Sequence, residues 1–238
     1  MPEFRSREEF LAVCAVDPAV YELQPDYRVF LLVVDGVGPE AASSSADELI
    51  ARAETHTRGL LASSPVVDLP HVAARRDAYR LGAKPQRTRN SLEALTRRAE
   101  KGLPRVNALT DVYNAISVLH QIPLGGEDFR RYVGPARLMR ASGEEPFDAV
   151  ADGQNVVEHP EDGEVVWCDD EAVTCRRWNW RHGCRTALSD DTRTAFFILD
   201  ALAPVTDAEL FAAADALAQA LSALGSEVRV SRRLVIAP

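Results

Sequence analysis

Three short polar segments in the second half of the sequence have residue types that could do chemistry. Asn107, Asp111 and Asn114 fall at positions i, i+4 and i+7, which places them on one side of an expected helix. Residues 125–128 are two glycines followed by Glu127 and Asp128. Residues 176–181 read RRWNWR. Carboxylates accept charge-assisted hydrogen bonds and glycine permits close backbone approach, so these segments could bind and orient a polar substrate.

Each of these segments also has a purely structural interpretation. The asparagine and aspartate side chains could cap the helix and brace the neighbouring turn, and the two acids could form a solvated acidic turn. The run at 176–181 could be a hairpin in which packed tryptophans alternate with surface arginines. No one of the three segments decides the function.

Signatures of the common hydrolases are absent from the sequence. It contains neither G-x-S-x-G nor H-E-x-x-H, and its five histidines are scattered, which argues against a serine triad or a zinc protease. His182 lies near Cys175 and Cys184, but we expect it on a surface or in a hairpin rather than at a metal. No C-x-x-C pair occurs among the four cysteines, so we expect free, mostly buried thiols and no metal or cofactor.

The charge distribution is uneven, although the whole chain has a formal charge of −9. Residues 75–105 hold ten basic and three acidic residues, a local charge of +7. Such a stretch, with Tyr79 inside it, could face RNA, or it could be two solvated helix faces.

Hydrophobic patterning predicts the elements that must position these residues. Residues 27–34 (YRVFLLVV) indicate a buried strand, and residues 45–48 begin a helix that runs to about residue 60. Asn90 begins a further helix that stops at 102–104, and the next helix spans 107–120 and ends in a glycine turn at 123–126.

The last third of the sequence predicts a hairpin followed by helices and a strand. Residues 164–169 and 172–180 are strand-like around an acidic turn. Ser189 and Thr206 are expected helix N-caps, residues 210–224 an amphipathic helix, and residues 227–237 a final strand. We therefore predict an α+β fold with a single domain over 1–238.

No segment of the sequence has the composition of a membrane span. The longest apolar run, residues 29–34, has the length of a strand, and the first ten residues lack an apolar core. We expect a cytoplasmic protein with no membrane partner.

Taken in order, several motifs resemble the B3/B4 domain of the phenylalanyl-tRNA synthetase beta subunit, and more closely its free-standing bacterial relatives. The resemblance covers about residues 70 to 200 well. Its motifs are DAYR at 77–80, GAKP at 82–85, SLEAL at 91–95, PRVNALTDVYN at 104–114, IPLGGED at 122–128, GEVVW at 163–167, RRWNWR at 176–181 and Thr186.

The resemblance implies a mixed sheet flanked by helices and an aminoacyl-tRNA editing activity. It divides the chain into an N-terminal part, 1–103, with the basic helical segment and a core, 104–238, with the editing pocket. In the synthetase this domain hydrolyses tyrosine mistakenly attached to tRNA, and some free-standing relatives act on canavanyl-tRNA for arginine. One methylene supports only about 10- to 200-fold discrimination by binding, so a second hydrolytic sieve is physically reasonable.

Roles for individual residues follow from the resemblance only where positions match. The helix asparagine of the family falls on Asn114, preceded by Tyr113. The synthetase's pocket histidine aligns with Gly125, where it is missing, which argues against tyrosine as the substrate. Asp128 is retained.

The implied mechanism positions a water at an activated ester and needs no strong nucleophile. Asn114 orients the ester or water, and backbone amides of Gly125 and Gly126 face the oxyanion. Glu127 and Asp128 hold a cationic group of the substrate, or one of them acts as general base. Tyr113, Asn179 and Arg181 are expected to line the pocket, with Trp178 and Trp180 packed beneath it.

The expected partner is the aminoacylated 3′ end of tRNA. Phosphate contacts are assigned to the basic stretch, at Arg75, Arg76, Arg80, Lys84, Arg87, Arg89, Arg97 and Arg98. Canavanyl-tRNA for arginine is the first candidate substrate. Another mischarged tRNA, a non-catalytic RNA-binding module and a small-molecule esterase remain alternatives.

Overall fold

A strand with both faces buried forms the centre of the fold in the computed structural model, which describes residues 6–38, 43–81 and 90–238. This strand, β2 (Arg28–Asp35), is buried at every residue except its first and last. It pairs antiparallel with β11 (Arg229–Val235) on one side and β10 (Thr194–Ala201) on the other. β3 (Leu124–Asp128) follows at the edge, giving the order β11-β2-β10-β3.

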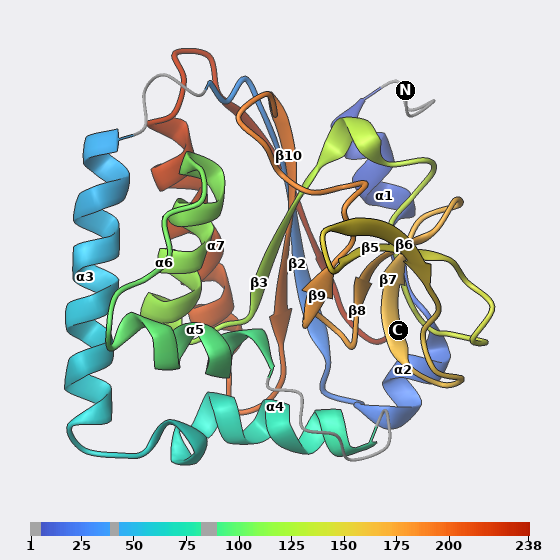
Figure 1. Cartoon of the computed structure of the whole chain (residues 1–238), viewed down its shortest axis with the longest axis horizontal. Helices are drawn as coiled ribbons and strands as arrows, with labels where there is room; N and C mark the ends of the chain where they lie inside the picture. Colours follow the sequence, from blue (N-terminus) through green and yellow to red (C-terminus); the bar gives the residue numbers. More distant parts are fainter. Residues whose placement is uncertain (1–5, 39–42, 82–89) are drawn as a thin grey trace.

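Side chains alternate across β2 and build two separate cores, one on each face. Phe30, Leu32 and Val34 pack with helices α6 (Ala108–His120) and α7 (Asp207–Ser222). The helix α3 (Ser43–Leu61) packs against α6 on its outer side (Figure 1). On the opposite face, Val29 and Leu31 enter a second core with the aromatic rings of the other sheet.

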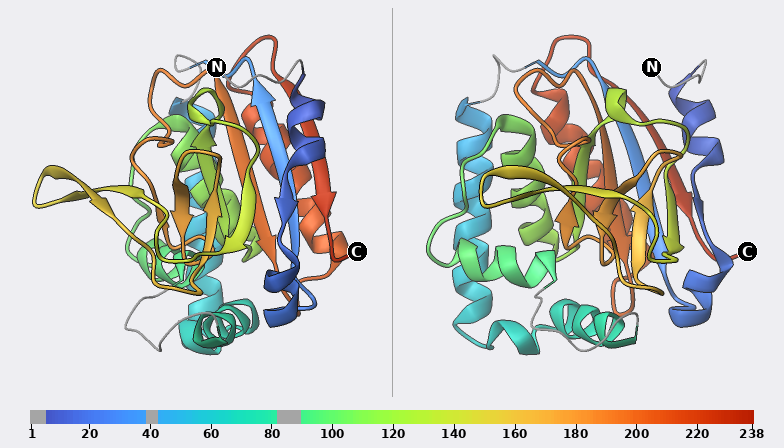
Figure 2. Two further views of the ribbon diagram at one scale, coloured as in Figure 1. Left: turned by 90° about the vertical axis from the view of Figure 1, so that its right-hand side faces the viewer. Right: turned by 45° about the vertical axis from the view of Figure 1, so that its right-hand side comes forward.

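That second sheet has five strands and completes a three-layer arrangement (Figure 1). Its order is β1 (Ala15–Val16), β4 (Arg137–Arg140), β7 (Val165–Cys168), β8 (Val173–Arg176) and β9 (Arg181–His182). A separate hairpin of β5 (Phe147–Ala151) and β6 (Gln154–Glu158) projects from the body, as the left view in Figure 2 shows.

The remaining helices frame the sheets. α1 (Arg7–Val13) and α2 (Pro18–Leu23) precede β2, and α4 (Pro70–Leu81) lies across the lower end of the sheets in Figure 1. α5 (Ser91–Ala99) contacts both α3 and α6. Two 3₁₀ turns, η2 (Val66–Asp68) and η3 (Phe129–Arg131), link these elements. None of the helices in the described ranges has the length and apolarity to cross a membrane.

Several sequence predictions are confirmed, including the α+β class, the central strand and the final strand. Three helix starts have the predicted side-chain caps. The Asn90 side chain accepts from Glu93 N at 2.8 Å, Asn107 from Thr110 N at 2.9 Å, and Thr206 from Glu209 N at 3.2 Å. The hairpin around the acidic turn is present as β7 and β8.

Two predictions of local structure are wrong. The expected glycine turn at 123–126 is the edge strand β3, because α6 already ends at Gln121, which has the left-handed conformation (φ 52°). The helix expected after Ser189 is absent, and the chain forms β10, of which all eight residues are buried. A continuous apolar run of this length has no periodicity that separates a buried strand from a helix.

Candidate active site

A fully buried carboxylate lies on the edge strand β3, with hydrogen-bond partners on both oxygens. Glu127 Oε1 lies 3.1 Å from Thr186 Oγ1 and 3.2 Å from His182 Nδ1. Its Oε2 accepts from the hydroxyl of Tyr132, which is also buried. Buried carboxylates require such partners, so the chain holds Glu127 in one orientation. Its acceptors face the protein's own donors, contrary to the expectation that Glu127 grips the substrate.

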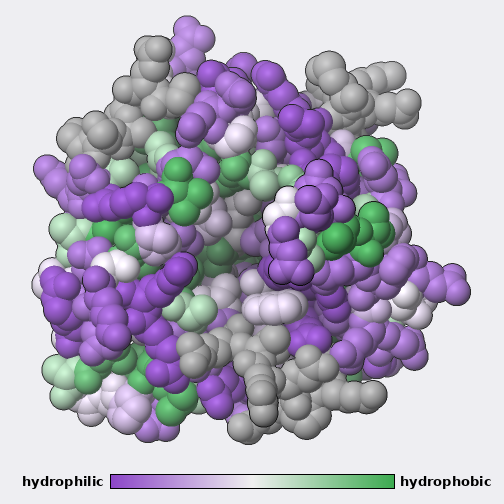
Figure 3. Space-filling model, viewed as in Figure 1, coloured by the Kyte–Doolittle hydropathy of each residue, from purple (hydrophilic) through white to green (hydrophobic). Residues whose placement is uncertain are grey.

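The ring of His182 lies directly against Gly125. A Cβ atom added to Gly125 would lie 2.6 Å from His182 Cε1 and 2.8 Å from Nε2. Only glycine leaves room for the imidazole there, because real Cβ atoms essentially never approach another atom this closely. The His182 side chain remains 25% exposed. Figure 3 shows this face of the molecule hollowed near its centre, where β3 and β9 lie in Figure 1.

The surroundings of His182 favour its protonated form. Burial acts to lower the pKa of His182, but Cys175 and Glu127 beside it outweigh that effect and raise the pKa well above its ordinary value. Burial also raises the pKa of the Cys175 thiol, while the neighbouring His182 acts to lower it. The raised pKa favours the imidazolium form of His182 beside Glu127, which is an arrangement suited to proton donation.

Two neighbouring residues of α6, Tyr113 and Asn114, were predicted to belong to this site. Burial raises the pKa of the Tyr113 hydroxyl, and the charges of His182 and Glu127 act on it, so the tyrosine lies within range of both. Its ring centroid lies 6.2 Å from that of Phe197. Asn114 is 7% exposed. Among the polar stripe of α6, Asn107 is the N-cap and Asp111 accepts from Val106 N at 2.9 Å, so the structural interpretation holds for those two.

A second buried acid, Asp200 on β10, forms hydrogen bonds with side chains from other parts of the chain. It accepts hydrogen bonds from the Tyr27 hydroxyl and from Asn179 Nδ2, the latter at 2.7 Å. Asn179 Oδ1 in turn accepts from Ser91 Oγ at 2.9 Å. Burial raises the pKa of Asp200. The predicted pocket residue Asn179 therefore bridges α5 and the central sheet.

The run at 176–181 is a tight turn rather than two alternating strands. β8 ends at Arg176, and both Arg177 and Trp178 have positive φ, at 48° and 63°. Arg176 is not on the surface, since its guanidinium binds buried Glu164 through contacts of 2.9 and 2.8 Å. Trp178 is buried, in line with its expected packing role. A polypeptide turn with left-handed residues breaks the period of two on which the prediction depended.

Arg181 does not line this site. Its Nη1 contacts Glu158 at 2.9 and 3.0 Å, toward the β5–β6 hairpin. Because Arg181 and His182 are adjacent in one strand, their side chains point to opposite faces. The position of Arg181 therefore does not support the predicted pocket role.

Asp128 likewise points away from the Glu127 cluster. Its Oδ1 accepts from Arg130 N at 2.9 Å and caps η3, and its Oδ2 accepts from Thr192 Oγ1 at 3.0 Å. Strand alternation places it on the face opposite Glu127. The catalytic role predicted for Asp128 is therefore not supported by its position.

The two glycine amides are also placed differently from the predicted oxyanion turn. Asp128 N donates to Thr186 O at 2.8 Å on the outer side of β3, and Asp200 N donates to Pro123 O at 3.1 Å on the β10 side. Alternation then turns the Gly125 N–H toward β10 and the Gly126 N–H toward residues 186–188, which cover that edge. Neither amide lies in an open turn.

A match to a family model identifies the family of the chain. The model described as the B3/4 domain matches residues 73–224, which is more than half of the sequence. The chain belongs to the B3/4 domain family. No curated protein matched it. Among solved structures it is similar to an N-terminal fragment of the phenylalanyl-tRNA synthetase beta subunit from Pyrococcus horikoshii, with 11% identity and a TM-score of 0.49. The similarity covers 91% of this chain and 49% of that fragment, so this chain spans about half the length of its structural relative.

Sequence reasoning missed His182 in this B3/4 domain. The available signal was the glycine at 125, against which the imidazole from β9 lies. Tyr132 and Asp200 were also missed, because no local motif surrounds either. Their roles depend on pairings across 5 and 173 positions of the chain.

Only part of the basic stretch of this B3/4 domain is exposed on the surface. Arg75 is 2% exposed, so it lies inside the protein and not on a phosphate-binding surface. Arg76 and Arg97 both contact buried Glu93, at 2.9 and 3.0 Å, and Arg98 is exposed. The other predicted contacts lie outside the described residues, namely the Arg80 side chain, Lys84, Arg87 and Arg89.

Within the described parts of the B3/4 domain, no group of three or more His, Cys, Asp or Glu residues is placed to hold a metal ion. All four cysteines are free, as predicted. Cys14, Cys168 and Cys175 are buried, whereas Cys184 is exposed.

Proposed function

We propose that this B3/4 domain is a deacylase that hydrolyses the ester between a wrongly attached amino acid and the 3′ end of tRNA. The observation that carries the proposal is the Glu127–His182 pair, built into the space above Gly125 and partly open to the surface. Membership of a family related to synthetase editing supports the reaction class.

The chemistry assigned to His182 is proton transfer at the leaving group. Water adds to the ester carbonyl carbon, and the tetrahedral intermediate then expels the ribose oxygen. The imidazolium donates its proton to that oxygen and regains one from the added water, so the net products are a free amino acid and a free ribose hydroxyl. A positioned acid of this kind contributes about 10² to 10⁴-fold in rate.

Glu127 acts through His182 and is a positioning residue. Its carboxylate fixes the imidazole by Nδ1 and stabilises the charged ring. Asn114 and Tyr113 are assigned to the ester or the attacking water, since Tyr113 lies within electrostatic range of both members of the pair. Arg98, with the predicted basic residues near it in sequence, is assigned to tRNA phosphates.

Canavanyl-tRNA for arginine is the proposed substrate, on the strength of the resemblance to free-standing editing proteins. The pocket histidine of the synthetase aligns with Gly125 in this chain, and His182 lies against that glycine. This difference supports a substrate other than tyrosyl-tRNA for phenylalanine. The cytoplasm, where aminoacyl-tRNAs are made and used, is the proposed location.

A deacylation panel tests the function. Purified protein is incubated with canavanyl-tRNA and arginyl-tRNA for arginine, and with tyrosyl-tRNA and phenylalanyl-tRNA for phenylalanine. Selective release of canavanine is the expected result, and equal hydrolysis of arginyl-tRNA excludes a canavanine editor. If wild-type protein binds tRNA but deacylates none of the four, the protein is a binding module. Hydrolysis of free aminoacyl esters without tRNA would instead indicate a small-molecule esterase.

A further inference from the structure

A β-bulge interrupts strand β8 directly beside the candidate active site. Val173 lies opposite Cys168 of β7, but it is Cys175, and not Thr174, that lies opposite Trp167. Thr174 is therefore the extra residue on β8. A bulge breaks the strict alternation of side chains along a strand, and bulges frequently redirect side chains next to active sites. We therefore expect the side chains of Thr174 and Cys175 to contact the same cluster.

Thr174 contacts the carboxylate end of the Glu127–His182 pair through a tyrosine. Its Oγ1 lies 3.4 Å from the hydroxyl oxygen of Tyr132, and that hydroxyl donates to Glu127 Oε2. Thr174 and Tyr132 are both buried. The first residue of the bulge thus supports the orientation of the carboxylate.

The second residue of the bulge, Cys175, lies directly opposite His182 of β9. The neighbouring pair is joined by a hydrogen bond from Gly183 N to Thr174 O at 2.7 Å. Hydrogen-bonded and non-hydrogen-bonded pairs alternate along an antiparallel ladder, so Cys175 and His182 form a non-hydrogen-bonded pair, in which the two side chains lie closest together. Because Cys175 is 1% exposed, its sulfur contacts protein and not solvent.

The thiol of Cys175 is oriented to accept from a positively charged ring. Its Sγ donates to the carbonyl oxygen of Arg176 at 3.8 Å, so the thiol proton is engaged there and the sulfur lone pairs remain for His182. A thiol sulfur is a weak acceptor, but it is also the negative end of the S–H dipole. It therefore favours an imidazolium over a neutral imidazole.

The effects on pKa agree with this geometry. Burial acts to lower the pKa of His182, while Cys175 and Glu127 raise it. Burial raises the pKa of Cys175, and His182 acts to lower it. Burial likewise raises the pKa of Tyr113 on α6 and of Asp200 on β10, with the charge of His182 acting to lower both. The imidazole thus faces groups from β3, β8, α6 and β10, and the thiol raises its pKa in the same direction as the Glu127 carboxylate.

We propose that Cys175 is a positioning residue for His182: the bulge at Thr174 aims its sulfur at the imidazolium, which the thiol and the Glu127 carboxylate hold together. The inference rests on the proposed deacylase function for its kinetic consequence, whereas the contact between thiol and ring is measured without turnover. Since Cys175 is buried, it acts through His182 and does not touch the substrate.

Titration of His182 tests the contact. The full-length protein is labelled with isotopic histidine and titrated by NMR, and His182→Gln assigns the signal. Cys175→Ala and Cys175→Val remove the sulfur, one by truncation and the other at similar volume, so either folded variant serves. Both should lower the pKa of His182 by about one, a roughly tenfold weaker hold on the proton, and Cys175→Ser should recover part of the difference. An unchanged pKa of His182 in a folded variant without the sulfur overturns the proposal.

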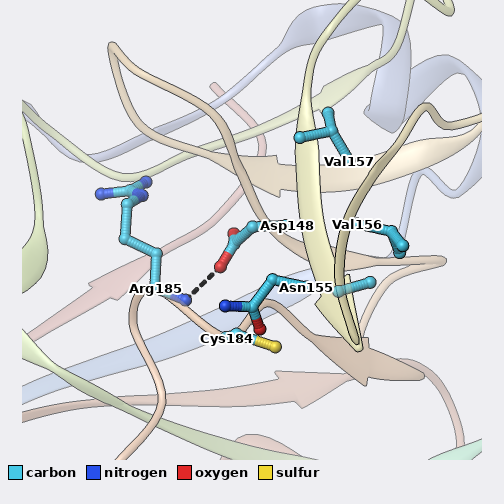
Figure 4. Close-up of a pocket in the computed structure, with 7 residues that line it drawn as sticks. Asp148, Asn155, Val156, Val157, Cys184 and Arg185 are labelled. Carbon is cyan, nitrogen blue, oxygen red and sulfur yellow. Dashed lines mark hydrogen bonds between the residues drawn. The ribbon is translucent and has the colours of Figure 1, made fainter. Parts of the chain in front are cut away.

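Two other cysteines provide matched controls. Cys168 is buried in β7 of the same sheet. Cys184 follows His182 by two positions, but it lies in a surface pocket beside the β5–β6 hairpin, as Figure 4 shows. Cys168→Ala and Cys184→Ala should leave the pKa of His182 unchanged. An equal shift in Cys168→Ala and Cys175→Ala would show that lost packing, and not the sulfur, changes the ring.

The pH dependence of deacylation gives the second readout. The proposed mechanism requires protonated His182, so kcat/KM should fall as the pH rises through its pKa. Cys175→Val should move this fall to lower pH by the amount found in the NMR titration, while the affinity for tRNA stays unchanged. A fall that stays at the wild-type pH overturns the positioning role. If wild type deacylates no aminoacyl-tRNA but Cys175→Val still lowers the pKa of His182, the proposed function is rejected and the thiol–imidazole contact is retained.

Discussion

His182 occupies the space that any side chain at Gly125 would need. The two residues come from strands of different sheets, β9 and β3, and a Cβ atom at position 125 would lie only 2.6 Å from the imidazole. The position of the imidazole therefore depends on the absence of a side chain at residue 125 as much as on its hydrogen bond to Glu127. If His182 acts as proposed, Gly125 matters to the activity although it carries no reactive group.

Gly125→Ala is expected to displace the imidazole and lower deacylation about 100-fold, because a shift near 1 Å at a catalytic group costs that much. Its free energy of unfolding should fall by about 1 to 3 kcal/mol, because displacing the imidazole removes a hydrogen-bond partner of the buried Glu127 carboxyl group. The control is Gly126→Ala, whose Cβ would lie 2.8 Å from the Phe197 ring in the core. That variant should lose about 1 to 3 kcal/mol by overpacking. Full activity of Gly125→Ala would contradict the proposed role of the ring.

His182→Gln removes the proton donor and is expected to lower kcat for deacylation about 10² to 10⁴-fold. The affinity for tRNA, measured by filter binding, should stay unchanged. Arg181→Gln is the matched control, since it is adjacent in the strand but points toward Glu158. If both variants lose activity equally, the loss reflects the hairpin and not the imidazole.

The raised pKa of His182 predicts a direction for the dependence of stability on pH. A folded-state pKa above the unfolded value means that the native state binds the proton more tightly. The resulting stabilisation is fully present below the unfolded pKa of about 6.5 and is lost as pH rises through the folded value. Urea denaturation of wild type and His182→Gln from about pH 6 to pH 10 measures it. The stability advantage of wild type should shrink with increasing pH, and an advantage that grows would show that the pKa is lowered.

Local signals in the sequence predicted most of the elements but few of the contacts in the site. The caps at Asn90, Asn107 and Thr206 were predictable because a cap depends on residues three positions apart. The strand at 194–201 was not, since a strand buried on both faces shows no alternation. Family resemblance pointed to Tyr113, Asn114 and Glu127, while the pairing of Glu127 with His182 depends on how two sheets pack.

The buried ion pair between Glu164 and Arg176 is expected to stabilise the turn at 176–181. Its side chain is fully buried and binds Arg176 through both oxygens, at 2.9 and 2.8 Å. Burial acts to raise the pKa of Glu164, but the Arg176 guanidinium outweighs it and lowers the pKa. Its stabilisation is therefore present above about pH 4.3 and is lost as pH falls through the lowered value.

Glu164→Gln should lower the free energy of unfolding by about 3 to 5 kcal/mol, because it leaves a buried guanidinium poorly paired. Glu158→Gln, at a carboxylate that is 31% exposed, should cost under about 1 kcal/mol. Denaturation at neutral pH measures both, and equal effects would show that burial of the pair is unimportant.

Replacement of Arg98 tests the proposed contact between the basic stretch and tRNA phosphates. It is exposed in the last turn of α5, so Arg98→Ala should weaken binding to all tRNAs alike and reduce the slope of log affinity against log salt by about 1. Arg232→Ala serves as control, since Arg232 lies on β11 and pairs with Asp215. Unchanged affinity and slope for Arg98→Ala would remove this residue from the interface.

The strand order β11-β2-β10-β3 also determines when the chain can fold during its synthesis. β2 leaves the ribosome well before its two partner strands, residues 194–201 and 229–235. Both edges of β2 therefore stay unpaired until those residues have been synthesised. Such long-range pairing slows folding and leaves a β-prone segment exposed to aggregation. Nascent chains of this protein are thus expected to depend on chaperones that shield residues 28–35 until β11 has emerged.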